Sequence, residues 1–311
     1  MGEFMQQTKE GIIIQSLSGF YQVLSEGAIH VTKPRGNFRH QQVKPLVGDL
    51  VQFEVGAEEE DLGRLVEVLP RRNQLIRPSV VNVDYALIMM SLVEPDFSYS
   101  LVDQFLVSVE LHRIQPLLLL SKYDVLVDQI GETKAQARVQ EIRAVYEPIG
   151  YPVHVVTPNS QGVEQVKRLI QTGIYVVMGQ TGVGKSTLLN QLLPHQTIET
   201  GEISQYLNRG RHTTREVTLY PLNQGMVADT PGFSALEFDT IEKEELAQYF
   251  PEIWRMSEHC RFRSCLHLEE PNCAVKTAVE QLEIATSRYQ SYLQLYQKIE
   301  QRKPIYNKRK K

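Results

Sequence analysis

A glycine-rich stretch, GQTGVGKST at residues 179–187, constrains the fold of this chain more than any other feature. It contains the pattern Gly-x-x-x-x-Gly-Lys-Ser, with an apolar run at residues 174–178 before it and an amphipathic stretch after it. Glycines allow backbone N–H groups to converge on phosphate oxygens, and the N-terminus of a following helix adds partial positive charge. We therefore expect a phosphate loop (residues 179–187) between a strand and a helix, rather than a chance glycine-rich turn.

The residues of this phosphate loop fall into two groups by their expected role. Lys185 is expected to reach the β- and γ-phosphates and to assist catalysis, and the Ser186 hydroxyl is expected to coordinate Mg²⁺. The remaining residues are expected to bind the nucleotide: Gly179, Gln180, Thr181, Gly182, Val183, Gly184 and Thr187.

Two downstream segments supply further groups that such a site needs. In GMVADTPGFS, residues 225–234, Asp229 is expected to hold the metal through water and the N–H of Gly232 to sense the γ-phosphate. Between this segment and the phosphate loop lies GRHTTRE, which carries Thr213 and Thr214. A threonine such as Thr214 coordinates Mg²⁺ only when a γ-phosphate is present, and this orders a switch loop.

A candidate base-reading motif lies upstream of the phosphate loop, at the end of a predicted buried strand. It consists of Ser121, Lys122, Tyr123 and Asp124, which we call the base loop. A carboxylate at Asp124 accepts two hydrogen bonds from the N1–H and N2 amine of guanine, which adenine does not offer as a pair. The Lys122 stem is expected to pack along the base. These four residues alone also fit an ordinary loop at the end of a strand.

The pattern of apolar residues divides the 311-residue chain into three expected domains. Residues 5–75 alternate short β-type runs with turns, which predicts a small all-β barrel or sandwich. Residues 76–239 alternate strands with helices, which predicts a mostly parallel sheet with helices on its faces. Residues 240–311 are expected to be helical, apart from a cysteine cluster.

The cysteine cluster has the spacing of a metal site. Cys260, Cys265, His267 and Cys273 form Cys-x4-Cys-x-His-x5-Cys, and three thiolates with one imidazole suit a closed, tetrahedral, structural Zn²⁺ site. Two alternatives are three buried free thiols and a site in which His259 replaces His267. The adjacency of His259 to Cys260 makes shared coordination awkward.

Composition limits the remaining possibilities. The net charge is −4, so the chain as a whole does not favour nucleic acid, and any such case depends on local patches. No stretch reaches the roughly 18 consecutive apolar residues of a membrane span. The N-terminus lacks the pattern of a signal peptide, and we expect a cytoplasmic protein with no membrane partner.

The order of these motifs resembles one known family. The base loop, VVTPNS at 155–160, the phosphate loop, HTT and DTPG follow one another in the order of circularly permuted GTPases. With KPRGNFR, PRRNQLIRP and CLHLEEPNCAV, the chain resembles the ribosome small subunit-dependent GTPase A family (RsgA) over nearly its whole length from residue 5. The resemblance explains why the phosphate loop comes so late.

The resemblance implies a multidomain fold: an N-terminal OB-fold barrel that binds RNA, a central permuted α/β P-loop GTPase and a C-terminal zinc-binding helical domain. It implies GTP or GDP with Mg²⁺ and one structural Zn²⁺ held by the four ligands named above. It also implies a monomer that acts on the 30S subunit and its 16S rRNA. In place of the usual catalytic glutamine the chain has Phe233 after Gly232, and the resemblance suggests that His212 positions the attacking water instead.

Two positions depart from the family pattern. Family members usually have asparagine where this chain has Ser121, and the shorter serine is expected to replace only part of its ties to neighbouring loops. Pro158 lies where a backbone N–H is expected to contact guanine O6, and proline has no N–H. That contact is expected from Thr157 or Asn159, or it is lost.

Basic residues at both ends of the chain support the RNA interpretation. The predicted barrel and linker carry Lys33, Arg35, Arg39, Lys44, Arg71, Arg72 and Arg77, and the tail carries Arg302, Lys303, Lys308, Arg309, Lys310 and Lys311. Contacts from such residues to phosphates give salt-dependent, mostly sequence-independent affinity. Two other functions stay open: an RNA-binding factor that uses guanine nucleotide only as a structural ligand, and, disfavoured by Asp124, an ATPase of RNA metabolism.

Overall fold

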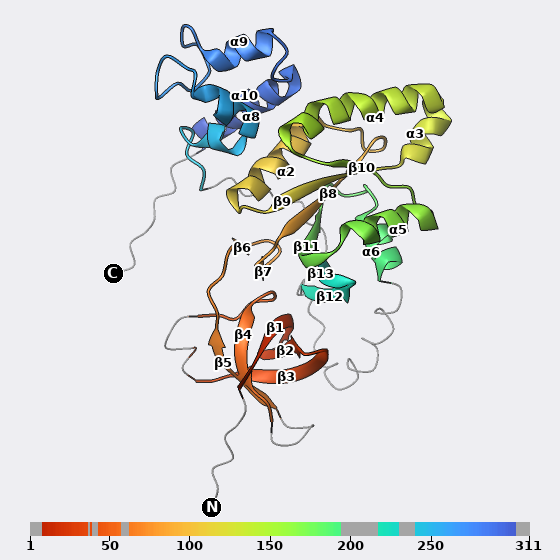
Figure 1. Ribbon diagram of the computed structural model, residues 1–311, viewed down its shortest axis with the longest axis vertical. Helices are drawn as coiled ribbons and strands as arrows, with labels where there is room; N and C mark the ends of the chain where they lie inside the picture. Colours follow the sequence, from red (N-terminus) through yellow and green to blue (C-terminus); the bar gives the residue numbers. More distant parts are fainter. Residues whose placement is uncertain are drawn as a thin grey trace, which may run out of the picture.

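A computed structural model describes residues 8–36, 38, 43–56, 62–193, 217–229 and 240–302 of the chain. Three parts follow one another along its longest axis (Figure 1): a small barrel, a central sheet covered by helices, and a helical C-terminal module. The barrel and the module lie at opposite ends of the molecule, with the central sheet between them.

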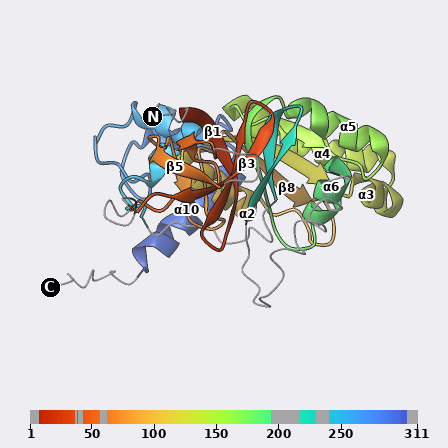
Figure 2. The same ribbon diagram turned by 90° about the horizontal axis from the view of Figure 1, so that it is seen from below.

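The barrel is made of five strands in the order β1-β2-β3-β5-β4, and β4 pairs back onto β1 to close it. These strands are β1 (Thr8–Leu17), β2 (Phe20–Ser25), β3 (Ala28–Pro34), β4 (Leu50–Glu54) and β5 (Gly63–Val68). β3 and β5 run parallel, and the other pairs are antiparallel. The side chains that fill the interior are fully buried, and they include Ile13, Val23, Val51, Phe53 and Leu65. The predicted OB-type barrel, which Figure 2 shows from below, is confirmed.

The central sheet has the order β10-β9-β8-β11-β13-β12, in which β12 alone is antiparallel to its neighbour β13. Its strands are β8 (Tyr85–Ser91), β9 (Gln115–Ser121), β10 (Val153–Val155), β11 (Thr172–Met178), β12 (Thr218–Leu222) and β13 (Gln224–Asp229). The chain builds outward from β8 to β10 and then returns to place β11 on the other side of β8. The direction of winding therefore reverses between β8 and β11.

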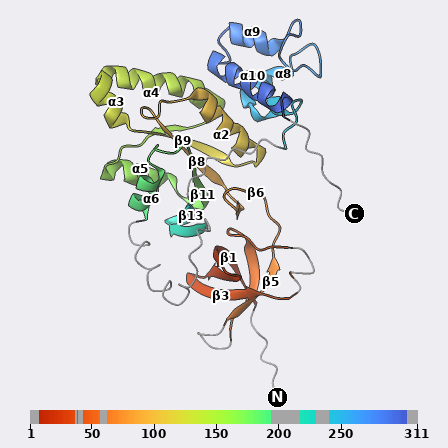
Figure 3. The ribbon, with the colours of Figure 1, turned by 180° about the vertical axis from the view of Figure 1, so that it is seen from behind.

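Helices cover both faces of this sheet (Figure 3), as the alternation of strands and helices predicts. They are α2 (Tyr99–Leu111), α3 (Tyr123–Ile130), α4 (Glu132–Tyr146), α5 (Ser160–Leu169) and α6 (Lys185–Leu192). Successive residues of β8 point to opposite faces: Ile88 and Met90 share a core with α2 and α4, and Leu87 and Met89 share another with α5 and α6. This two-sided burial explains the continuous apolar run of the strand.

The segment between the barrel and the sheet, expected to be a linker, forms a fixed hairpin of β6 (Gln74–Leu75) and β7 (Val80–Val81), and the predicted domain boundary at residue 75 falls within it. Arg71 donates from Nε and Nη2 to the two oxygens of the fully buried Asp49, at 2.7 and 2.8 Å. Arg72 donates to Asp84 at 2.5 Å, and the other oxygen of Asp84 accepts the Ile174 N–H at 2.8 Å. Both arginines, expected to contribute to a phosphate-binding patch, are paired with carboxylates in this structure.

The C-terminal module packs on the outer side of α2. It contains η2 (Leu246–Tyr249), α8 (Pro251–Ser257), α9 (Ala274–Glu280) and α10 (Thr286–Glu300). Its core includes Phe250, Ile253, Val275, Tyr292 and Leu295, and Val107 of α2 belongs to the same cluster. Across the described part of the chain, no helix combines the length and apolar character that crossing a membrane requires.

We predict that Arg71→Met lowers the free energy of unfolding by about 3 kcal/mol or more, because it leaves the Asp49 carboxylate buried without its cation. Urea unfolding followed by circular dichroism measures this loss. Lys9→Met, which breaks the exposed pair with Glu26, is the matched control and is expected to change the stability little, because solvent screens surface ion pairs. Equal, small losses for the two variants would contradict a structural role for Arg71.

Candidate nucleotide site and metal centre

The carboxyl ends of the parallel strands β9, β8, β11 and β13 meet at one edge of the central sheet. The base loop begins at the end of β9, the phosphate loop follows β11, and Asp229 ends β13. Ligands of doubly wound sheets bind at such an edge, where the direction of winding reverses. Three segments that are far apart in sequence thus meet where a nucleotide would bind.

The phosphate loop has a backbone that depends on glycine. Gly179, Gly182 and Gly184 have φ angles of 142°, 87° and 99°, which side chains rarely tolerate. A Cβ on Gly179 would lie 2.1 Å from the carbonyl oxygen of Met89 in β8. The buried Val183 side chain anchors the middle of the loop in the core beside α6.

Lys185 is the first residue of α6, and its ammonium group lies across the loop. Its Nζ donates to the carbonyl oxygens of Gly179 at 2.7 Å and Gln180 at 2.6 Å. Burial lowers the pKa of Lys185 below its usual range. The hydroxyl-bearing Ser186 and Thr187 are exposed in the first turn of α6. A cation, helix N–H groups and two hydroxyls are therefore presented together, as phosphate binding requires.

Ser121 ties the base loop to the phosphate loop. Its hydroxyl lies 2.8 Å from the carbonyl oxygen of Val183 and 3.2 Å from that of Met90, and both atoms are hydrogen-bond acceptors. A hydroxyl has one hydrogen, so it donates to one of the two carbonyls at a time. The shorter bond crosses 62 positions of sequence and joins the two predicted binding segments. Serine thus retains a link to a neighbouring loop.

The other two functional residues of the base loop lie on either side of the start of α3. Lys122 has a left-handed backbone with φ 58°, and its ammonium group donates to the carbonyl oxygen of Glu94 in the loop after β8. Asp124 lies in the first turn of α3 with its side chain exposed. The Asp124 carboxylate is therefore accessible to a ligand. The Lys122 side chain is held in place by its hydrogen bond to Glu94.

The loop after β10 is fixed against α5 and α6. Asn159 caps α5, because its Oδ1 accepts the N–H of Gly162 at 2.9 Å, and the same atom accepts the Thr157 hydroxyl at 2.8 Å. The Pro158 carbonyl accepts Nε2 of Gln191 in α6 at 3.1 Å. Both residues named as alternatives for the guanine O6 contact therefore belong to an ordered loop.

Asp229 is the described member of the predicted switch segments. The register of β13 on β11 pairs Ala228 with Val176, so Asp229 lies one position further along, just before the phosphate loop begins. Desolvation raises the pKa of the Asp229 carboxyl. The other switch residues, His212, Thr213, Thr214, Gly232 and Phe233, lie outside the described residues, and their roles stay predictions.

The four predicted metal ligands come together in the C-terminal module. The ligand atoms of Cys260, Cys265, His267 and Cys273 all lie within 4.8 Å of one another. Nδ1 of His267 is 3.6 Å from Sγ of Cys260 and 3.5 Å from Sγ of Cys273, and those two sulfurs are 3.9 Å apart. His259, the alternative ligand, is not a member of the cluster among the described residues.

These distances fit a tetrahedral ion. With metal–sulfur bonds of about 2.3 Å and metal–nitrogen bonds of about 2.05 Å, tetrahedral angles separate two sulfurs by about 3.8 Å and a sulfur from a nitrogen by about 3.6 Å. Burial raises the pKa of the Cys265 thiol to about 12 and also raises that of Cys273, so these sulfurs need a neighbouring cation to become thiolates. Burial lowers the pKa of His267, which favours the neutral imidazole that binds metals.

Helix α10 holds in place the segment of residues 260–273 that carries the four ligands, which we call the metal loop. The hydroxyl of Tyr289 donates to the carbonyl of His267 at 2.6 Å, and that of Tyr292 donates to the carbonyl of Leu266 at 2.9 Å. Glu270 accepts the N–H groups of Leu266 and Leu268 at 2.7 and 2.8 Å. No motif in the sequence predicts these supporting residues. The tyrosines at helical spacing in α10 are the one indication of this contact in the sequence, and the same spacing is equally typical of core residues.

The order and site of the central domain define the class of protein, a P-loop nucleotide-binding protein with permuted strand order. The sequence model of the RsgA GTPase family matches residues 68–239, and that of the RsgA N-terminal domain matches residues 10–63. The chain belongs to the RsgA GTPase family.

Individual relatives agree with this over nearly their full length. The chain is 47% identical over 300 residues to the small ribosomal subunit biogenesis GTPase RsgA of Enterococcus faecalis, which covers 96% of this chain and 98% of that one. It is 49% identical over 297 residues to RsgA 2 of Listeria innocua, covering 96% and 99% of the two chains. The crystal structure of YloQ, a circularly permuted GTPase, has a TM-score of 0.81 at 39% identity and covers 98% of this chain and 100% of YloQ. YjeQ from Thermotoga maritima has a TM-score of 0.82 at 32% identity, covering 96% and 100%.

We predict that Ser121→Ala weakens guanine nucleotide binding about fivefold, because it removes the hydrogen bond between the base loop and Val183. Titration with a fluorescent GDP analogue measures the dissociation constant. Ser257→Ala, which removes a comparable bond from an exposed hydroxyl to the Trp254 carbonyl in α8, is the control and is expected to leave affinity unchanged. An unchanged dissociation constant for Ser121→Ala would show that the tie does not serve nucleotide binding.

We predict that His267→Ala abolishes stoichiometric metal binding, whereas His259→Ala retains it, because His267 alone of the two lies among the thiols. Elemental analysis of the purified chains measures the metal, and thermal unfolding reports the accompanying loss of stability. Full metal content in His267→Ala together with loss in His259→Ala would reverse the assignment.

Proposed function

We propose that this chain is a Mg²⁺-dependent GTP hydrolase that acts in assembly of the small ribosomal subunit. The observation that carries the proposal is the meeting of the phosphate loop and the base loop at one sheet edge, joined by the Ser121–Val183 hydrogen bond. The relatives named as small ribosomal subunit biogenesis GTPases support the cellular role.

Different residues would bind the phosphates, the base and the Mg²⁺ ion. Backbone N–H groups of the phosphate loop and the first turn of α6 surround the phosphates, and the Lys185 ammonium group neutralises their charge. Asp124 accepts hydrogen bonds from the guanine edge, while Lys122, held at its tip by the Glu94 carbonyl, lines the base with its stem. Ser186, Thr214 and Asp229 are the residues that would hold Mg²⁺, directly or through water. Bound Mg²⁺ stabilises the charge that develops on the phosphate oxygens.

Hydrolysis requires an oriented water, and Phe233 offers no polar atom for this task. We assign the orientation of water to His212, whose neutral imidazole accepts a hydrogen bond near pH 7. A chain without a fixed glutamine turns over slowly by itself, and the small subunit would accelerate hydrolysis by ordering the switch residues. GTP would favour the subunit-bound state and GDP the free state, which requires different affinities of the two nucleotide forms for the subunit.

The barrel and the C-terminal module would contact the subunit, with 16S rRNA as the ligand. Lys33 is exposed on β3, and Lys44 is exposed before β4, whereas Arg35 is paired with Glu54. The basic tail beyond Arg302 and the residue Arg39 lie outside the described residues. We assign zinc to the Cys₃His cluster, since its donors and distances suit that ion. The chain is expected to work as a cytoplasmic monomer.

The second candidate is an RNA-binding assembly factor that binds guanine nucleotide as a structural ligand with negligible turnover. Pro158 favours it, because the proline cannot supply the backbone N–H expected at guanine O6.

We predict that purified small subunits stimulate GTP hydrolysis by the full-length chain, and that His212→Ala lowers the stimulated kcat about 100-fold or more with little change in GDP affinity. Phosphate release at one fixed salt concentration measures the rate. His259→Ala, an exposed histidine of the module, is the control and is expected to retain stimulation. GTP binding without any stimulation would favour the structural-ligand function instead.

A further inference from the structure

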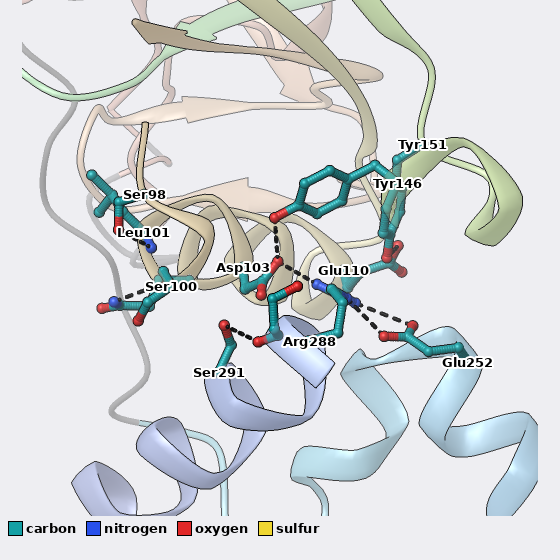
Figure 4. A network of polar contacts seen from close by, with 12 residues as sticks. Ser98, Ser100, Leu101, Asp103, Glu110, Tyr146, Tyr151, Glu252, Arg288 and Ser291 are labelled. Carbon is teal, nitrogen blue, oxygen red and sulfur yellow. Dashed lines mark hydrogen bonds and ion pairs between the residues drawn. The ribbon is translucent and has the colours of Figure 1, made fainter. Parts of the chain in front are cut away.

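A cluster of buried charges joins α2 of the central sheet to the C-terminal module, outside both sites described above (Figure 4). Arg288 of α10 is 1% exposed, Asp103 of α2 is fully buried and Glu252 of α8 is also buried. Nη1 of Arg288 donates to Oδ1 of Asp103 at 2.6 Å, and its Nε and Nη2 donate to the two oxygens of Glu252 at 2.7 and 3.1 Å. One guanidinium group therefore joins three helices.

The surroundings of the cluster make its geometry specific. The Tyr146 hydroxyl donates to the same Asp103 oxygen at 2.9 Å, and the Phe250 ring centroid lies 4.6 Å from Cζ of Arg288. Buried charges are costly unless their partners stay in place, so a shift of α10 along α2 would expose unpaired charge to an apolar interior. The cluster thus stabilises one register of α10 on α2.

Contacts beside the cluster extend the same interface. The Ser100 hydroxyl donates to Oε1 of Gln294 at 2.7 Å, and Nζ of Lys298 donates to Oε1 of Gln104 at 3.3 Å. Val107 of α2 is fully buried in the core of the module. On its other face α2 packs into the sheet core through residues that include Val102, Phe105, Leu106 and Val109. Helix α2 therefore contributes side chains to the core of the central sheet and to the core of the C-terminal module.

The N-terminal end of α2 lies next to the nucleotide site. Ser98 caps the helix, and the loop before it supplies the Glu94 carbonyl that accepts the Lys122 ammonium group. In the same loop, Pro95 lies 3.9 Å from the position that a Cβ on Gly182 would take. A displacement of α2 would thus change the contacts that this loop makes with the base loop and with the phosphate loop.

The other partner, α10, holds the metal loop. Tyr289 follows Arg288 directly, and Tyr292 lies one helical turn beyond it; their hydroxyls donate to the carbonyls of His267 and Leu266. Contacts therefore connect the metal ligands, α10, Arg288, Asp103, α2 and Lys122 without a gap.

We propose that the Arg288 cluster couples metal binding in the C-terminal module to guanine nucleotide binding in the central domain. A bound metal fixes the metal loop, and the hydrogen bonds from Tyr289 and Tyr292 then fix α10. The Arg288 cluster fixes α2 against α10, and α2 fixes the Glu94 carbonyl that accepts the Lys122 ammonium group. The metal then strengthens nucleotide binding, and nucleotide slows metal release by the same factor, since linkage between two binding sites is reciprocal. The coupling rests on the nucleotide binding proposed above, and it makes the metal of the C-terminal module a distant regulator of that binding.

The test compares the dissociation constant of a fluorescent GDP analogue for the metal-loaded and the metal-stripped full-length chain. We expect stripping to weaken binding about fivefold or more in the wild type. In the triple variant Asp103→Asn, Glu252→Gln, Arg288→Met, which removes all three charges together, we expect stripping to change the constant less than twofold. Lys243→Gln, which breaks the exposed pair with Glu300 within the module, is the matched control and is expected to keep the wild-type ratio.

A measurement on the wild type alone covers the case in which the triple variant does not fold. Hydrogen exchange of the amides of residues 286–300 is expected to slow when GDP binds, although these residues do not line the nucleotide site. Nucleotide binding that is indifferent to the metal in the wild type, or unchanged exchange in α10, would overturn the coupling. Absence of nucleotide binding under every condition would instead overturn the proposed function on which it rests.

Discussion

The phosphate loop lies against β8 because Gly179 has no side chain there, and a Cβ would stand 2.1 Å from the Met89 carbonyl oxygen. Because β8 pairs with both β9 and β11, this contact fixes the loop after β11 beside the end of β9. The Ser121 hydroxyl reaches the Val183 carbonyl for that reason, across 62 positions of sequence. The geometry of the nucleotide site is thus a consequence of strand neighbours and one close backbone approach, and chain order matters little to it.

Permutation changes what is attached to the two ends of this sheet. The barrel precedes β8, and the Arg72–Asp84 pair holds that entry point, since Asp84 also accepts the Ile174 N–H at the start of β11. The C-terminal module follows Asp229 of β13, and its first helical element, η2, begins at Leu246. Each end of the central domain therefore leads into one of the other two parts of the molecule.

The sequence predicted the elements whose cause is local. Glycines at 179, 182 and 184 require a special backbone wherever they lie, alternating apolar runs define strands and helices, and four ligands within fourteen residues define a metal site. It did not predict what long side chains would do. Arg71 and Arg72, expected to contribute to a phosphate-binding patch, pair with carboxylates 22 and 12 positions away, and Arg288 pairs with Asp103 across 185 positions. The sequence shows that a residue is charged, but only the tertiary structure shows whether that charge is solvated or paired with a carboxylate.

The module has two connections to the nucleotide site, and they differ physically. One is covalent, through the chain that leaves Asp229. The other is packing, through Arg288, α2 and the loop that supports Lys122. A covalent connection alone limits how far two bodies move apart, but it leaves their orientation free. A buried ion cluster fixes orientation, because each hydrogen bond in it is lost when the helices rotate or slide. The proposed coupling between the C-terminal module and the nucleotide site therefore requires the packed connection as well as the covalent one.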